Sequence, residues 1–164
     1  NVRNHIYSQC LKNTLVVNGV RTLWKMTSSL ERLRNDMNIK LIKEKIDNEN
    51  KRMGSELEYT FKYKGHKCKV KRIEEYGHLC GYIYLNVKRG SEEYEIIDEL
   101  AHCGVSYHKG NLIGFDCAHA GDFSLRMYNL FENKTYLSDL ETYKDLEYVE
   151  NNIKEIIDSL QKGG

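Results

Sequence analysis

Two short segments hold most of the side chains in this chain that can do chemistry. Residues 102–107 and 114–122 contain two histidines, two cysteines and two aspartates, namely His102, Cys103, Asp116, Cys117, His119 and Asp122. These side-chain types serve proteins as metal ligands, nucleophiles and general bases. Glycines stand among them, and glycine lets the backbone turn sharply. A functional site is therefore sought here first.

Three kinds of chemistry fit this cluster, and the sequence leaves all three open. One is a divalent-metal site made by His102, His119 and Asp122, with Cys117 as an alternative third ligand and a position left for water. Another is a Cys117 nucleophile activated by one of the histidines, while Asp116 or Asp122 orients the imidazole. The third is acid–base catalysis by a His–Asp pair without metal.

A structural role is the alternative, and we favour it over a catalytic one. The apolar run Ile113–Phe115 leads directly into Asp116-Cys-Ala-His119, so Cys117 can pack as a small hydrophobic residue in a strand. In an extended strand Cys117 and His119 would share one side. If residues 123–131 are helical, Asp122 stands at the N-cap position.

A second candidate site is a lysine-rich hairpin. The alternation of residues 57–64 and 66–71 around Gly65 predicts two antiparallel strands with their lysines on one side. Such a face could bind nucleic-acid phosphates or an acidic protein surface, or simply lie in water, as one side of an antiparallel sheet often does. The candidate binding residues are Lys62, Lys64, Lys67, Lys69 and Lys71, together with Arg32 and Arg34 of the preceding segment.

Composition bounds the class of protein. The chain has 164 residues and a formal net charge of +1, so we expect one domain with its own core and no overall attraction to polyanions. No apolar run is long enough to span a bilayer, and the first residues lack the apolar stretch of a signal peptide. The five cysteines are scattered without C-x-x-C pairs, which indicates the reducing cytoplasm.

The N-terminal part is predicted to be mainly helical. Residues 15–19 suggest a short strand and turn ending at Asn18-Gly19. From residue 22 to residue 53 apolar side chains recur at helical spacing, with Leu33 and Met37 in the most regular part of the stripe. This amphipathic helix could pack on its own domain or pair with a second copy in a homodimer.

The remaining elements predict an α+β fold. Besides the lysine hairpin, residues 80–87, 104–108 and 112–116 have strand-like patterns, residues 92–101 are ambiguous, and residues 146–160 carry a second helical stripe. We expect a mostly antiparallel sheet of four or five strands packed by the C-terminal helix. The predicted domains are residues 1–56, a helical extension, and residues 57–164, the α+β module.

Several runs of residues resemble a family of small phage and prophage proteins. They are Tyr-Lys-Gly-His-Lys-Cys at 63–68, Gly-His-Leu-Cys-Gly-Tyr-Ile at 77–83, His-Cys-Gly-Val-Ser-Tyr at 102–107, Gly-Phe-Asp-Cys-Ala-His-Ala-Gly-Asp at 114–122 and Glu-Tyr-Val-Glu-Asn-Asn-Ile-Lys at 147–154. The resemblance covers roughly residues 57–162 and omits the N-terminal helical part. It departs at residue 103, where the family pattern has glycine, so Cys103 is the less favoured functional thiol, and again at 88–92, where it has a proline-containing loop.

The resemblance implies an accessory protein that works in the cytoplasm of a host cell. It favours a binding protein over an enzyme: an inhibitor of host defence machinery, anti-CRISPR-like, that grips a host protein or ribonucleoprotein through the N-terminal helix and the lysine hairpin. The alternatives are a small hydrolase or nuclease, dependent on a metal or on Cys and His, that uses the cluster of residues 102–122, and a module that binds a nucleotide or another small ligand.

Overall fold

A computed structural model of the chain describes residues 33–130 and 142–162. The chain divides into two compact units, residues 1–41 and residues 42–164. The predicted strand and turn at residues 15–19 and the helical segment 22–32, including Arg32, lie outside the described residues. The second unit therefore carries both candidate sites.

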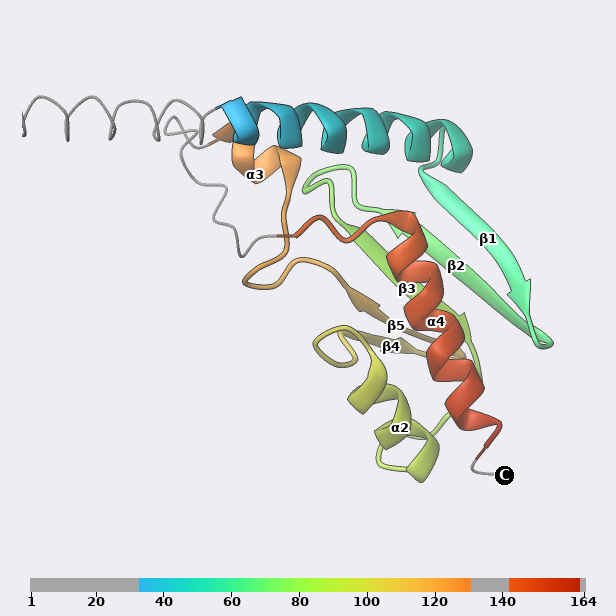
Figure 1. The fold of residues 1–164 in the computed structure, drawn as a ribbon. Helices are drawn as coiled ribbons and strands as arrows, with labels where there is room; N and C mark the ends of the chain where they lie inside the picture. Colours follow the sequence, from blue (N-terminus) through green and yellow to red (C-terminus); the bar gives the residue numbers. More distant parts are fainter. Residues whose placement is uncertain (1–32, 131–141, 163–164) are drawn as a thin grey trace, which may run out of the picture. The chain divides into compact units, whose positions relative to one another are not determined.

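The described part of the N-terminal helix covers residues 33–53 and confirms the predicted helix over that range (Figure 1). In the second unit its buried side chains are Ile46, Glu49 and Met53, which follow one another at helical spacing. Leu33 and Met37 are instead 60% and 66% exposed. The stripe predicted through these two residues is therefore not the buried face of the described helix.

Five strands form one antiparallel sheet, as the sequence predicted, and the structure gives their order as β1-β2-β3-β5-β4. The strands are β1 (Glu58–Tyr63), β2 (His66–Arg72), β3 (Leu79–Tyr84), β4 (Tyr107–Lys109) and β5 (Leu112–Asp116). Lys64 and Gly65 join β1 to β2 with φ angles of 44° and 87°. Two successive positive φ angles mark the tight turn that suits the twist of a hairpin, and they fix its register.

Two helices cover one face of this sheet (Figure 1). Helix α4 (Leu146–Leu160) begins at Asp145, whose side chain accepts a hydrogen bond from the Tyr148 N–H, and buries the predicted stripe that includes Val149 and Ile153. Helix α2 (Glu92–Leu100) resolves the ambiguous acidic segment as a helix capped by Ser91. Its first turn is acidic, and Ile97 packs into the core.

The compact second unit begins earlier than the predicted boundary at residue 57. Residues 42–53 belong to it, and Met53 lies in the same hydrophobic cluster as the inner residues of the strands and α4. A short helix, α3 (Leu125–Leu130), follows the histidine-containing loop. None of the helices in the described ranges is both long and apolar enough to cross a bilayer.

Candidate functional site

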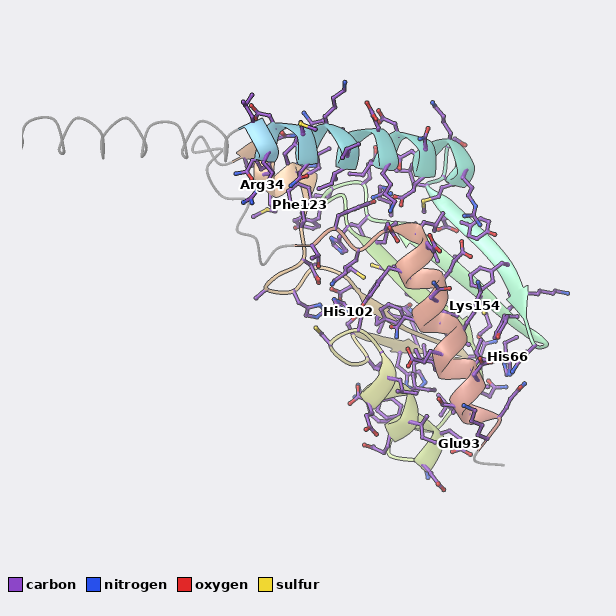
Figure 2. The ribbon with its side chains drawn as sticks, viewed as in Figure 1. Arg34, His66, Glu93, His102, Phe123 and Lys154 are labelled. Carbon is purple, nitrogen blue, oxygen red and sulfur yellow. The ribbon has the colours of Figure 1, made fainter. Side chains whose placement is uncertain are left out.

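The loop that carries His102 is fixed at the end of α2 by a residue of α4. The side-chain amide of Asn152 donates to the Leu100 carbonyl at 2.8 Å, and its oxygen accepts from the His102 N–H at 3.0 Å. A side-chain amide satisfies both a donor and an acceptor that the helix end leaves open. The position of the His102 ring, labelled in Figure 2, is therefore set by the core of the domain.

Both ring nitrogens of His102 have a partner. Its Nε2 lies 2.8 Å from Asp122 Oδ2, and its Nδ1 lies 2.9 Å from the hydroxyl of Tyr148. The His102 and Asp122 side chains are only 11% and 5% exposed, so this pair is largely shielded from water. Partial burial raises the pKa of Tyr148, and its hydroxyl is protonated at neutral pH. The imidazole is thus held between a carboxylate and a phenol.

His119 completes the cluster from the loop after β5. Its ring stands edge-on to that of His102, with centroids 5.5 Å apart. The backbone N–H of His119 donates to Asp122 Oδ2 at 2.9 Å. The His119 Nδ1 lies 3.5 Å from the same oxygen and 3.9 Å from Asp116 Oδ1, but makes no hydrogen bond although the atom is buried. The expected convergence of His102, His119 and Asp122 is therefore present, with Asp116 at its edge.

Asp122 does not cap a helix, contrary to the expectation. Ser124 occupies that position instead, since its Oγ accepts from the Met127 N–H at 3.4 Å and α3 begins only at Leu125. The Asp122 carboxylate is occupied by His102 and by the His119 backbone. Asp122 therefore holds the His102 loop and the His119 loop together and does not cap a helix.

The two cysteines of the cluster differ in burial, and Cys117 has the core position that the structural alternative predicted. Cys117 follows Ile113 and Phe115 at a spacing of two, and all three side chains lie in the hydrophobic core, Cys117 at 3% exposure. Burial raises the pKa of the Cys117 thiol, which keeps it protonated. Cys103 is exposed, and its Sγ lies 3.9 Å from His102 Nε2. The thiol nearest the histidine is the one judged less favourable.

The backbone at Cys103 has a φ of 57°, in the left-handed region. Glycine adopts this conformation without a steric penalty, whereas a residue with a Cβ loses about 1–2 kcal/mol. The thiol is held in a strained turn directly beside His102.

These contacts restrict the chemistry that the cluster can do. In a Cys–His–Asp relay the carboxylate binds one ring nitrogen and the other receives the proton of the thiol. Here Asp122 and the Cys103 thiol both face Nε2 of His102. The geometry is that of atoms gathered around one point, the arrangement of metal ligands, and not that of a proton relay.

Two residues of this cluster escaped the sequence analysis. Tyr148 and Asn152 were named only as part of the run of residues 147–154, with no role assigned to either. Their spacing of four places them on one helical face, beside the buried stripe. A polar pair at that spacing next to an apolar stripe was the available signal.

The second candidate site is the sheet face opposite α2 and α4. The register aligns its side chains in rows across the strands: Lys62, Lys67, Tyr84, Leu112 and Lys109 in one, and Thr60, Lys69, Tyr82, Gly114 and Tyr107 in the next. We call the lysines and tyrosines of these rows, with Lys71, the lysine–tyrosine face. Both rows of this face contain lysines as well as tyrosines.

The rings of this face are paired with the lysines. The Lys67 Nζ stands 4.7 Å from the centre of the Tyr84 ring, and the Lys69 Nζ 5.3 Å from that of Tyr82. Tyr82 also meets Tyr107 edge to face at 5.7 Å, and Tyr107 is 40% exposed. The face thus offers exposed ring surface beside positive charge.

Four of the five predicted hairpin lysines lie on this face, but Lys64 does not. It occupies the turn and pairs with Asp158 of α4 at 2.8 Å, an ion pair that raises the pKa of Lys64. The reason is the turn itself, which ends β1 at Tyr63 and breaks the alternation. Glu58 pairs with Lys71 at 2.9 Å and with Lys69 at 3.5 Å, and these lysines hold the pKa of the Glu58 carboxyl below its ordinary value.

Arg34 is exposed on the helix of residues 33–53, in the first compact unit.

Comparison with protein-family models, with curated proteins and with solved structures found no match for this chain.

Proposed function

We propose that the protein acts by binding, as a phage or prophage accessory protein that inhibits host defence machinery in the manner of an anti-CRISPR. Its lysine–tyrosine face meets the phosphate-rich surface of a ribonucleoprotein target in the host cytoplasm. The phage assignment rests on the resemblance of residues 57–162. The mode of action rests on the chemistry of the open sheet face.

The observation that carries the proposal is the row of like charges on the hairpin. Lys62 and Lys67 stand directly opposite each other in the β1–β2 register, and both are exposed. Like charges in that position destabilise a sheet by up to about 1 kcal/mol. Lys109 continues the same row across the sheet. An anionic partner offsets this repulsion, whereas solvent alone does so only by screening.

The tyrosines favour nucleic acid over an acidic protein surface. Proteins that bind single-stranded nucleic acid combine lysines for the backbone with aromatic rings for the bases, and one stacked base contributes about 1–3 kcal/mol. Tyr84 and Tyr107 provide such rings between Lys67, Lys69 and Lys109. An acidic protein surface would need the charges but not the interleaved rings.

The other features have supporting roles in this proposal. The contacts among His102, Asp122 and Asn152 tie the loops to α4 and hold the domain together. The N-terminal helix exposes Leu33, Met37 and Leu41 at a spacing of four, an apolar row suited to gripping the protein part of the target or a second copy of the chain.

Plaque formation tests the proposal. When the parent protein is expressed in a host whose CRISPR system restricts a phage, we expect plaques to return. The Lys62→Glu/Lys67→Glu/Lys69→Glu variant should fail to restore them, while Lys64→Glu, which lies off the face, should restore them as the parent does. Circular dichroism verifies that each variant is folded. Restriction that persists with the parent, or full rescue by the triple variant, would contradict the proposal.

A further inference from the structure

We propose that His102, Cys103 and His119, with Asp122 beside them, form a binding site for a transition-metal ion, for which Zn²⁺ is the best match. Within the described residues, these two histidines and Cys103 each place one donor atom within 4.8 Å of the other two. Imidazole nitrogen and thiolate sulfur are the donors that zinc prefers, and they disfavour Mg²⁺ and Ca²⁺. The site is independent of the lysine–tyrosine face.

The separation of the Cys103 thiol and the His102 ring is close to that of two ligands around a tetrahedral ion. With ordinary Zn–N and Zn–S bonds, a nitrogen and a sulfur ligand are about 3.6 Å apart. The observed separation of Cys103 Sγ and His102 Nε2 is 3.9 Å. Asp122 Oδ2 lies 2.8 Å from His102 Nε2 and 3.5 Å from His119 Nδ1, close enough to become the fourth ligand or to bind a metal-bound water.

The surroundings of His102 fit a ligand that binds through Nε2. Metal-binding imidazoles usually hold their other nitrogen in a hydrogen bond that fixes the tautomer and the ring orientation. Tyr148 supplies that bond, with its hydroxyl 2.9 Å from Nδ1. When Nε2 binds the ion, Nδ1–H donates to the Tyr148 oxygen, and the thiol proton of Cys103 leaves to solvent.

Two further observations point to a ligand. The buried His119 Nδ1 makes no hydrogen bond, although a carboxylate oxygen lies 3.5 Å away. Cys103 holds its thiol beside two imidazoles from a left-handed backbone that costs stability. A bound ion would account both for the unsatisfied nitrogen and for the strained cysteine.

Cobalt titration tests the site. Protein purified without a histidine tag, stripped with a chelator and kept reduced is titrated with Co²⁺, and Zn²⁺ affinity is measured by competition with a chromophoric chelator. We expect the visible bands of four-coordinate cobalt together with a near-ultraviolet thiolate charge-transfer band. Cys103→Gly, which relieves the left-handed strain, should fold as well as the parent but lose the charge-transfer band.

The histidine variants complete the test. His119→Ala should weaken Zn²⁺ binding on the order of 100-fold or more. His66→Ala, at the start of β2, is the matched control and should bind as the parent does. Absence of the cobalt bands, an unchanged charge-transfer band in Cys103→Gly, or unchanged Zn²⁺ affinity in His119→Ala would each overturn the proposal and leave the cluster as a purely structural contact.

Discussion

Replacing Arg72 by methionine should lower the free energy of unfolding by about 3–5 kcal/mol, because it leaves a buried carboxylate without its partner. Arg72 is 4% exposed, and its Nη2 donates to Glu49 Oε2 at 2.6 Å. Its Nε donates to Asn50 Oδ1 at 2.7 Å, and its Nη1 to the Gly77 carbonyl at 2.9 Å. One side chain thus joins the N-terminal helix, β2 and the turn before β3.

Glu49 extends this network to α4. Its carboxylate accepts from the Leu146 N–H at 2.9 Å and from the Tyr143 hydroxyl. A double variant, Arg72→Met with Glu49→Gln, removes both charges; the amide oxygen can still accept from the Leu146 N–H, and the amide NH2 can donate to the Tyr143 oxygen. We expect it to be more stable than Arg72→Met alone in urea unfolding. The account would be contradicted if Arg72→Met lowered the free energy of unfolding by less than about 1 kcal/mol, or if the double variant were no more stable than Arg72→Met. Either result would show that the Arg72–Glu49 pair does not stabilise the fold as a buried ion pair.

The second large effect is expected from Gly81→Ala in β3, which should lower the free energy of unfolding by about 2–3 kcal/mol. A Cβ at this position would lie 2.6 Å from Phe115 Cζ and 2.9 Å from Val149 Cγ1. Both neighbours are almost fully buried, so neither can move into solvent. The glycine is there because Phe115 of β5 and Val149 of α4 both approach β3 closely at this position.

A double-mutant cycle separates this contact from a general weakening of the strand. Phe115→Leu removes the ring atoms that the new methyl group would meet. We therefore expect Gly81→Ala/Phe115→Leu to lose less stability in urea unfolding than the two single variants lose together. Additive losses, or a Gly81→Ala protein as stable as the parent, would contradict the packing described for α4.

The fold was predictable from the sequence because its signals are local. Alternation with a period of two predicted the β1–β2 hairpin and β5. Apolar residues spaced three and four apart predicted the stripe of α4 that contains Val149 and Ile153. The same periodicity was misleading for Leu33 and Met37, which are exposed. A helical period shows that a face exists but not what covers it.

The histidine cluster was predictable only in part. His102, His119 and Asp122 were expected to meet because they occur close together along the chain. Their partners Tyr148 and Asn152 come from α4, and only the tertiary packing of α4 beside the loop brings them there. Cys117 is buried, as its structural interpretation predicted, whereas the place of Cys103 beside His102 was missed because residue 103 departs from the pattern of the resemblance.

The lysine–tyrosine face was predicted for the hairpin but not for the full sheet. Alternation placed Lys62 and Lys67 on one side, and their cross-strand neighbours became known only with the order β2-β3-β5-β4. That order adds Tyr82, Tyr84 and Tyr107 to the charges. The sheet order thus turns a row of lysines into a surface on which lysines and tyrosines lie together.

The most direct test of this account is the affinity for a fluorescent single-stranded oligonucleotide, measured by anisotropy over a range of salt concentrations. We expect parent affinity to fall steeply with salt, with a logarithmic slope of about 0.7 per phosphate contact. Lys62→Glu/Lys67→Glu/Lys69→Glu should bind on the order of 100-fold more weakly with a shallower slope, while Lys64→Glu matches the parent in slope. Parent binding that is insensitive to salt, or a triple variant that binds like Lys64→Glu, would contradict the assignment of this face to a polyanionic partner.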